Sequence, residues 1–302
     1  MRFGVAIPAY GEGAEGPFVR ETIAAAEELG FESVWLPDHI AVPDYATSVN
    51  LSVPFLEPLA ACGWGLGATT RLRFGIDVLV APYRHPLLVA AMAGTLTRLG
   101  GERLVLGVGI GYLRGEFDAL GLDCYDERAA VTEEFLRTWR DAPEGVHVVT
   151  PPSRVPVWVG GNVRAARRRA ALLGDGWHPF WMPAEAYRAA RDEIVAWRAE
   201  AGLTGPFTFS FSCGPTALTD GEPRPSPLGP RAPVGSEFRY APAAWTTPDG
   251  RVRLVGTPEQ VTGDLRLLEE AGVEHVALRF GPDGIEQMAR FAREVLPALS
   301  AA

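Results

Sequence analysis

The chain of 302 residues contains no lysine, and all 28 of its basic residues are arginines. A Schiff base requires a lysine amine, so class I aldolase chemistry and pyridoxal-phosphate catalysis are excluded. A P-loop requires the lysine of its Gly-Lys-[Ser/Thr] motif, so P-loop nucleotide hydrolysis is excluded as well. We therefore predict that arginine or backbone groups make any contact to the anionic tail of a cofactor.

Cysteine is also scarce, because Cys62, Cys124 and Cys213 are the only three and lie far apart. They form neither a disulfide framework nor a metal-ligand spacing, which favours a reducing cytoplasm and no bound metal. The sequence lacks the G-x-S-x-G motif of many serine hydrolases. It also lacks the apolar run of about 18–20 residues that spans a bilayer, and Pro8 interrupts the N-terminus too early for a signal peptide.

Basic clusters are small, and 37 acidic residues give the chain a formal net charge of −9. The largest cluster is Arg167-Arg168-Arg169. Nucleic acid and anionic membranes are therefore not expected as partners, which leaves a small-molecule substrate.

One local pattern recurs along the chain: a helical stretch, a glycine, two or three further residues and a short apolar strand. Its clearest copies cover residues 28–36 and 270–278. Glycine suits the left-handed position after a helix, and strands that are apolar on both faces are typical of buried parallel sheets. The eight strands predicted along the chain are Arg2–Ile7, Ser33–Pro37, Leu72–Val80, Leu104–Gly109, Val155–Gly160, Gly176–His178, Phe207–Cys213 and His275–Arg279.

Eight such units predict a single α/β domain over residues 1–302, folded as a (β/α)8 TIM barrel. The alternative is an open doubly wound sheet, which more often carries a dinucleotide fingerprint at its first turn, and residues 8–13 carry none. Residues 40–67 and 215–250 follow strands 2 and 7 and are longer than the other connections. Since catalytic groups of such barrels gather at the C-terminal ends of the strands, we expect both to be inserted loops that wall a pocket.

Two helices have clear sequence patterns. Residues 257–260, Thr-Pro-Glu-Gln, predict a capping box with proline at the first helical position. The other helix carries an apolar stripe, which we expect to face the core. The stripe consists of Leu87, Leu88, Ala91, Met92, Thr95, Leu96 and Leu99.

Histidines at strand ends are candidate proton donors. Asp38 and His39 follow strand 2, and His178 ends strand 6. At such a position a histidine is about as well explained by catalysis near neutral pH as by a structural role. His147 and His275 are expected to be peripheral.

Glycine-rich turns follow strands 4 and 5. Residues 107–111, Gly-Val-Gly-Ile-Gly, are not a dinucleotide fingerprint, because its third glycine would fall on Tyr112. They either admit a planar or phosphorylated ligand or relieve crowding at the barrel rim. Gly160-Gly161-Asn162 precedes a helix rich in arginine, and free N–H groups there favour an anion. This helix carries four arginines, and we expect at least two of them only to be exposed to solvent on its surface. They are Arg164, Arg167, Arg168 and Arg169.

Together, these motifs resemble the luciferase-like flavin and deazaflavin oxidoreductases, and most closely their coenzyme F420-dependent branch. The resemblance itself implies a TIM barrel, which agrees with the strand count. The matching stretches, in the order of that family, are residues 31–39, 71–86, 106–121, 155–179 and 256–278.

By this resemblance, Asp38 and His39 would lie beside the deazaflavin ring, and Asp77-Val78 would form the non-proline cis peptide against its face. Arg164 and Arg168 would hold the acidic tail of the cofactor. Sugar-phosphate dehydrogenases of the family have an acidic catalytic residue where this chain has Tyr112, which argues against sugar-phosphate oxidation. The remaining residues assigned to the cofactor are Gly109, Ile110, Gly111, Gly160, Gly161, Asn162 and His178.

The resemblance implies hydride transfer between C5 of coenzyme F420 and a small metabolite, with reduction of an imine or a conjugated alkene favoured. His39 or Tyr112 would supply the proton. One alternative is a monooxygenase of the same fold that uses FMN, and another is a barrel that binds a flavin or deazaflavin without catalysis. Because members of this family often form dimers, we expect a homodimer.

Overall fold

Eight parallel strands close into a barrel in the computed structural model, which describes residues 1–47, 54–141, 144–148, 150, 155–221, 254–280 and 284–300. The barrel closes because the last strand pairs with both the first strand and β8. The eight strands are β1 (Arg2–Ala6), β2 (Ser33–Leu36), β3 (Arg73–Ile76), β5 (Leu104–Gly109), β6 (Val157–Gly160), β7 (Gly176–His178), β8 (Thr208–Leu218) and β10 (His275–Phe280). The predicted (β/α)8 TIM barrel is therefore confirmed.

Two short strands extend the barrel wall. The predicted third strand is interrupted after β3 and resumes as β4 (Leu79–Val80), which pairs with β5. β8 runs to Leu218, beyond the predicted end at Cys213, and β9 (Leu254–Gly256) pairs with its last residues. Residues 215–218, predicted as the start of an inserted loop, are therefore strand, while residues 222–250 of that prediction lie outside the described residues.

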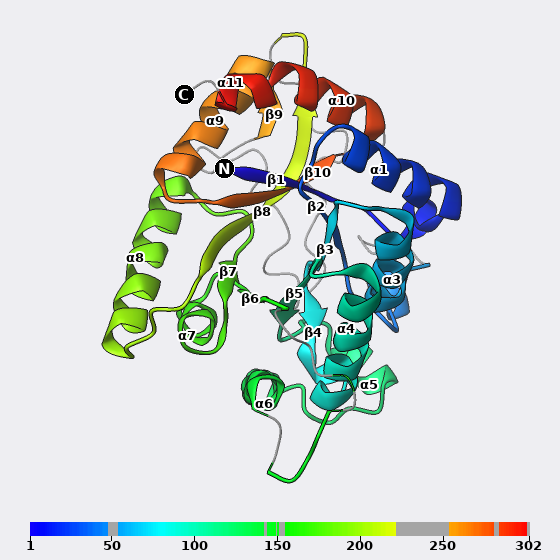
Figure 1. The fold of residues 1–302 in the computed structure, drawn as a ribbon, viewed down its shortest axis with the longest axis vertical. Coiled ribbons are helices and arrows are strands. Elements are labelled where there is room, and N and C mark those ends of the chain that lie inside the picture. The colour runs from blue at the N-terminus through cyan, green and yellow to red at the C-terminus, as the bar shows by residue number, and fades with distance from the viewer. Residues whose placement is uncertain are drawn as a thin grey trace.

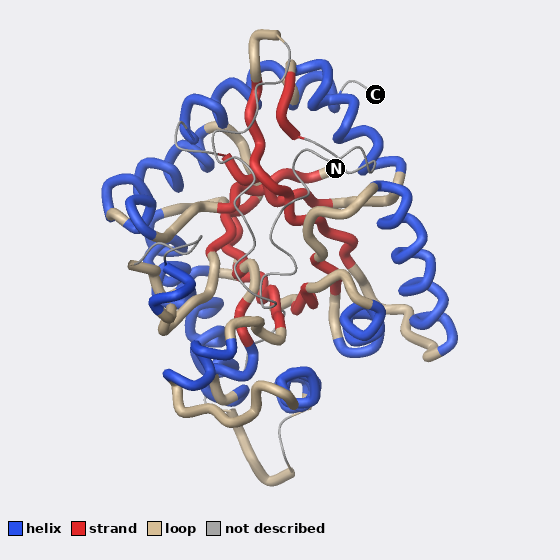
Figure 2. The backbone as a smooth tube through the Cα atoms, turned by 180° about the vertical axis from the view of Figure 1, so that it is seen from behind, coloured by secondary structure: helices blue, strands red, loops and turns tan. Residues whose placement is uncertain are grey.

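Helices surround the barrel on its outside (Figures 1 and 2). Those between consecutive barrel strands are α1 (Gly16–Glu28), α3 (Pro58–Ala68), α4 (Pro86–Gly100), α6 (Arg128–Arg140), α7 (Arg164–Leu173), α8 (Ala184–Glu200) and α9 (Pro258–Glu270). Shorter elements are η1 (Gly11–Ala14), α2 (Asp44–Thr47), η2 (Ala81–Tyr83) and α5 (Arg114–Ala119), and α10 (Gly284–Glu294) and α11 (Leu296–Ser300) follow β10. Within the described residues, no helix is both long and apolar enough to cross a bilayer.

Several local predictions can be compared with these helices. The capping box is present at the start of α9, where Thr257 and Gln260 bond each other's backbone N–H groups. Gly30 and Gly272 have positive φ at the ends of α1 and α9, as the recurrent helix–glycine pattern predicts. The predicted loop over residues 40–67 includes α2 and most of α3, and residues 48–53 lie outside the described residues.

The apolar stripe of α4 faces the core only in part, because Met92 and Leu96 pack against the core while other members are exposed. Leu88 is 57% exposed and Leu99 85% exposed. The buried face of α4 consists instead of Val89, Ala90, Ala93, Gly94 and Thr97. Small side chains bring this helix close to the barrel, while Leu88 and Leu99 lie on its outer side.

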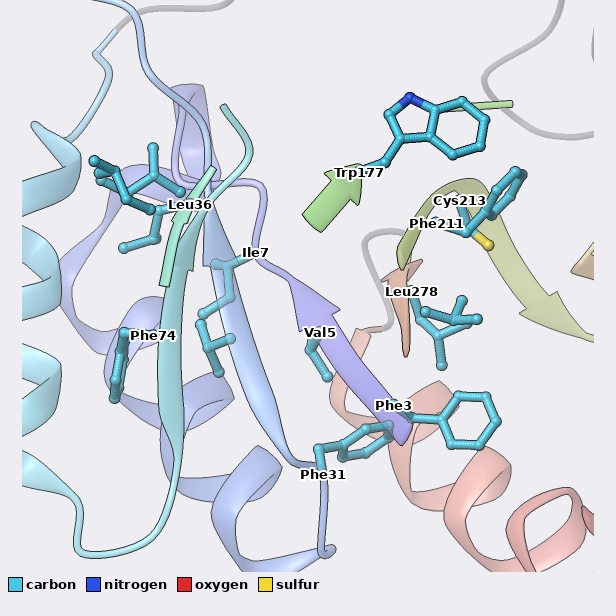
Figure 3. Close-up of a cluster of buried hydrophobic side chains, with 14 of the residues drawn as sticks. Phe3, Val5, Ile7, Phe31, Leu36, Phe74, Trp177, Phe211, Cys213 and Leu278 are labelled. Atoms are coloured by element: carbon cyan, nitrogen blue, oxygen red, sulfur yellow. The ribbon is translucent and has the colours of Figure 1, made fainter. Parts of the chain in front are cut away.

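The two faces of the barrel strands differ in chemistry. Outward-facing residues form the hydrophobic core between strands and helices, for example Phe3, Val5, Phe74 and Leu278 (Figure 3). A separate small apolar cluster of Ala6, Trp35, Val105, Trp158 and Ala277 occupies the alternate, inward positions.

Glycines make room for the tryptophans inside the barrel. The Trp35 and Trp158 rings stack with centroids 5.1 Å apart. A Cβ at Gly75 would clash with the Trp35 ring, and one at Gly176 would clash with the Trp158 ring. The barrel interior is thus filled by two indoles and by polar side chains rather than by layers of branched aliphatic residues.

Candidate active site at the barrel mouth

The break between β3 and β4 lies at the C-terminal mouth of the barrel and contains a cis peptide bond between Asp77 and Val78, as the resemblance predicts. The Val78 side chain lies against Gly109 at the end of β5 and Gly160 at the end of β6. A Cβ at either glycine would press on Val78. Val78, Gly109 and Gly160 form an apolar surface at the strand ends, which we call the Val78 ledge.

His39 and Tyr112, the two predicted proton donors, lie together at the same end of the barrel, after β2 and β5. Their ring centroids are 5.9 Å apart, with the rings perpendicular. The His39 ring also meets Phe55 edge-on at 5.0 Å. Tyr112 is 38% exposed, and the His39 side chain 12%. Both polar groups are therefore held in part by aromatic packing and remain partly accessible.

Glu116 of α5 holds the loop that follows β2. Its Oε2 lies 2.9 Å from His39 Nδ1, and its Oε1 accepts hydrogen bonds from the backbone N–H groups of Ile40 and Ala41. The side chain is fully buried. Burial alone would raise the pKa of this carboxyl, but the bonds from His39, Ile40 and Ala41 outweigh it and lower the pKa. An ionised Glu116 therefore fixes the orientation of His39 and the proton on Nδ1.

Tyr83 of η2 lies near the same carboxylate. Burial, together with the negative charge of Glu116, raises the pKa of this phenol well above its usual range. Tyr83 is therefore neutral at any physiological pH, and its hydroxyl remains a hydrogen-bond donor rather than an anion.

Asp38 is buried, and both of its oxygens are engaged. Arg84 donates to Oδ1 and Oδ2 at 2.8 and 2.7 Å, and the Val80 N–H donates to Oδ2 at 2.8 Å. Such a bidentate pair is strong and geometrically specific. It ties the end of β2 to the β4 turn, and the contact of Asp38 with a cofactor ring stays a prediction.

Asp77 points toward polar residues of β7, β8 and β10. His178 Nε2 lies 3.2 Å from its Oδ1, Ser212 donates to Oδ2 at 2.8 Å, and an Arg279 nitrogen lies 3.4 Å from Oδ2. Burial alone would raise the pKa of Asp77, but the contacts with His178, Arg279 and Ser212 hold it well below its usual range. Asp77 is therefore an anion at the floor of the mouth.

The glycine turns after β5 and β6 are closely packed. Gly111 has φ +76° and lies against Val80 and Phe117, while the preceding Ile110 is half-buried. After β6, Gly161 has φ +110° and its carbonyl accepts a bond from Trp177. The Asn162 side chain bonds both backbone groups of Phe180, at 2.6 and 3.1 Å, so it joins the loops after β6 and β7.

The two predicted tail-binding arginines lie on the outer surface. Arg164 is 68% exposed, lies 3.5 Å from Glu193 and stacks over Trp197 of α8. Arg168 lines a surface hollow between α6 and α7. The structure does not bring either side chain to the Val78 ledge, and their role with a cofactor tail stays a prediction.

Four residues of the site were not predicted from sequence: Arg84, Glu116, Ser212 and Arg279. Arg84 and Glu116 occur within the matching stretches, but nothing local indicates their partners. The expectation that His275 is peripheral is wrong, because the residue is fully buried inside the barrel. Its neighbours Val276 and Leu278 belong to the outer core, so strand alternation could have placed it inside. Among the described residues, no three His, Cys, Asp or Glu side chains are arranged to hold a metal.

Comparison with known proteins gives relatives of two cofactor classes. An uncharacterised protein of Mycobacterium tuberculosis is 35% identical over 61% of this chain and 72% of its own. The F420-dependent glucose-6-phosphate dehydrogenase of Microbacterium testaceum is 30% identical, over 50% of this chain and 49% of the relative. The FMNH2-dependent dimethylsulfone monooxygenase of Pseudomonas fluorescens is 25% identical, over 92% of this chain and 85% of the relative.

The fold is also found among solved structures. An F420-dependent secondary alcohol dehydrogenase, in complex with an F420–acetone adduct, superposes with a TM-score of 0.78 at 18% identity. The match covers 99% of this chain and 98% of that one. The family model described as luciferase-like monooxygenase matches residues 1–221. The chain therefore belongs to the luciferase-like monooxygenase family.

Proposed function

We propose that this protein is an oxidoreductase that uses coenzyme F420 to transfer a hydride between C5 of the deazaflavin and a small metabolite. Reduction of an imine or a conjugated alkene is the favoured reaction. The observation that carries the proposal is the pairing of His39 and Tyr112 at the same end of the barrel as the Val78 ledge. It combines two candidate proton donors with a surface that suits a planar ring.

The residues at the mouth fit such a cofactor. A Cβ at Gly109 or Gly160 would meet the Val78 side chain, so both glycines let Val78 pack against the strand ends, where a planar group would contact it. The bound deazaflavin would supply the hydride chemistry. The chain would bind the ring, orient the substrate beside it and exclude competing reactions.

His39 would exchange the proton at Nε2. Its Nδ1–H is directed to the ionised Glu116, which leaves Nε2 as the nitrogen available to a substrate. The Glu116 carboxylate also stabilises the imidazolium that donates the proton. The Tyr112 phenol is the second donor in reach of the same space. A His39→Ala variant with unchanged cofactor binding and unchanged turnover would remove His39 from this role.

The FMN-dependent relative supports a second candidate function, a monooxygenase that uses reduced FMN and oxygen. Titration of the purified protein with F420 and with FMN, followed by fluorescence, separates the two. We expect saturable F420 binding. Tight FMN binding without F420 binding would overturn the first proposal in favour of the second.

A binding barrel without catalysis is the third candidate, since Tyr112 stands where sugar-phosphate dehydrogenases of the family have an acidic residue. Oxidation of reduced F420 in the presence of a panel of imines and enones tests it. We expect turnover with at least one class of acceptor. F420 binding without turnover on any acceptor would favour the non-catalytic barrel.

The proposed enzyme is a homodimer. Leu88 and Leu99 of α4 are largely exposed, and Trp64 of the adjacent helix α3 is 46% exposed. Leu96 packs against Gly63, so the two helices lie side by side. Exposed apolar residues gathered on neighbouring helices are typical of a surface that packs against another subunit.

A further inference from the structure

A chain of polar side chains runs through the inside of the barrel, with hydrogen-bond contacts from Trp35 to His178 and an ion-pair contact between His178 and Asp77 at its end. It starts at the N-terminal end, where Ser33 and His275 begin β2 and β10, and it ends at Asp77 in the mouth. At the N-terminal end, Ser33 Oγ lies 3.0 Å from Trp35 Nε1 and 2.8 Å from His275 Nε2. In the middle, Ser210 Oγ lies 3.2 Å from His275 Nδ1 and 2.7 Å from His178 Nδ1. At the mouth, His178 Nε2 lies 3.2 Å from Asp77 Oδ1.

The middle of this chain is inaccessible to water, whereas both ends reach solvent. The side chains of His178 and His275 are 0% exposed, and Ser210 is fully buried. At the mouth, Asp77 is 13% exposed. At the other end, Glu32 is 26% exposed, and its Oε2 lies 3.4 Å from His275 Nε2.

The ionised Asp77 sets the direction of the hydrogen bonds in the chain. Asp77 can only accept, so the proton of His178 is assigned to Nε2, beside Asp77 Oδ1. Nδ1 of His178 then accepts from Ser210, and the Ser210 oxygen accepts from His275 Nδ1–H. His275 Nε2 in turn accepts from Ser33, whose oxygen also accepts from the Trp35 indole N–H. In this assignment all bonds point toward Asp77.

We propose that Glu32, His275, Ser210, His178 and Asp77 form a proton relay that connects solvent at the N-terminal end of the barrel with the candidate site. The relay itself does not depend on the cofactor, but its use in hydride transfer rests on the proposed function. Reduction of a substrate by a hydride consumes a proton, and a path through the barrel would supply it from the face opposite the mouth.

The relay step conserves protons and electrons. The Glu32 carboxylate takes a proton from solvent and passes it to His275 Nε2, where an N–H bond forms as the O–H bond of Glu32 breaks and the Ser33 hydroxyl turns away from that nitrogen. His275 then gives its Nδ1 proton to Ser210 while Ser210 gives its own to His178 Nδ1. His178 finally gives its Nε2 proton to Asp77, which passes it to the mouth. No redox change occurs at any atom.

The charges around the chain suit transient rather than permanent proton binding. Burial, only partly offset by Glu32, lowers the pKa of His275 to about 4, so the ring is neutral at rest. Asp77 keeps a low pKa and does not retain the proton. The other charged groups that face the chain are Arg2 and Arg73, which pair with Glu32 at 3.4 and 3.0 Å, and Arg279 beside Asp77.

Nitrogen NMR of the apoprotein labelled with 15N-histidine tests the arrangement. We expect His275 in the Nδ1–H form and His178 in the Nε2–H form. Ser210→Ala removes the acceptor of the Nδ1 proton, so His275 should switch to the Nε2–H form and donate to Glu32. Ser210→Thr keeps the hydroxyl and should keep both forms. If Ser210→Ala does not fold, Ser33→Ala removes the donor to Nε2 and predicts the same switch.

Two results would overturn the relay. One is His275 in the Nε2–H form in the unaltered protein, or no change in the serine variants. The other is an unchanged rate of exchange of the His275 ring N–H with water in Glu32→Gln. We expect this variant to slow the exchange by about tenfold or more, since a positioned acid–base group has effects of that order. An unchanged rate would exclude entry at Glu32. Glu269→Gln, which alters the partner of the N-terminal amine, is the matched control.

None of these measurements requires a bound cofactor. Failure of the relay would therefore appear in the apoprotein spectra, whereas failure of the proposed function would appear as absent F420 binding. The two outcomes are distinguishable.

Discussion

His39 Nδ1 lies 2.9 Å from Glu116 Oε2, across 77 positions of sequence. The contact joins the loop after β2 to α5, and the same carboxylate binds two backbone N–H groups of that loop. A buried carboxylate with three donors holds a geometry that neither segment could maintain alone.

Glu116→Gln should lower turnover more than it changes cofactor binding. The amide keeps the size of the side chain but loses the negative charge that stabilises a protonated His39. We expect kcat to fall by about tenfold or more, which is in the range of acid–base contributions, with KM changed less. Steady-state kinetics with reduced F420 would measure this, with the exposed Glu21→Gln as a control. Equal kcat in Glu116→Gln and the parent would contradict the positioning role.

His275 should make the protein less stable in mild acid. Its pKa is lowered from 6.5 in an unperturbed ring to about 4 in the fold, chiefly by burial. Between these values the unfolded chain binds the proton and the native chain does not, so stability falls as the pH falls. The loss is at most about 1.4 kcal/mol for each pH unit in that window.

Urea unfolding of the parent and of His275→Gln across this pH range would measure the effect. The variant should be less stable near neutral pH and should lose the steeper part of the pH dependence. His85→Gln changes an exposed histidine and should retain the parental slope. A slope that persists in His275→Gln would exclude the buried ring as its origin. Glu32, with a pKa lowered from 4.5 to about 2, acts only at lower pH, where its stabilising contribution is lost as the pH falls.

Gly75→Ala should destabilise the barrel from the inside. The added Cβ would clash with the Trp35 ring, and overpacking of this kind costs about 1–3 kcal/mol. Gly67→Ala is the matched control, because it adds the same methyl group to helix α3 where no atom lies within 4 Å. It should raise stability slightly through helix propensity. Chemical denaturation would compare the two, and equal midpoints would contradict the packing described for Trp35.

Serine substitutions at Leu88 and Leu99 should shift the protein from dimer to monomer. Both side chains lie on the outer face of α4, where replacement removes apolar contact area without opening the core. Light scattering during size-exclusion chromatography at several concentrations would measure the masses. Leu267→Ser, which alters a 50% exposed leucine on α9, should leave the mass unchanged. A parent protein that is monomeric at all concentrations would refute the dimer.

The sequence predicts the barrel well because its signals are local and repeated. Each strand is a short apolar run, and Gly30 and Gly272 mark the ends of the helices before β2 and β10. The side of α4 that faces the core could not be predicted by hydrophobicity alone. There the close approach of helix and sheet requires small residues, so Ala90 and Ala93 are buried while Leu99 is exposed.

The candidate site was predicted in part. His39, Asp77 and Val78 lie shortly after the ends of β2 and β3, as the sequence predicts, and their contact with a cofactor stays a prediction. The partners Glu116 and Arg279 come from distant elements, and only the closed barrel brings them near. No pattern in the sequence specifies such pairings, since they depend on the register of several strands at once.

The pairing of β8 with β9 brings together the two ends of the segment that connects these strands. Leu218 is aligned with Gly256, and the N–H of Thr219 donates to the Gly256 carbonyl, so both ends of the intervening segment are anchored at adjacent points. The entropy of closing a loop grows only slowly with its length. A change in the length of the segment between β8 and β9 would therefore cost the barrel little free energy, which makes this junction a natural graft point.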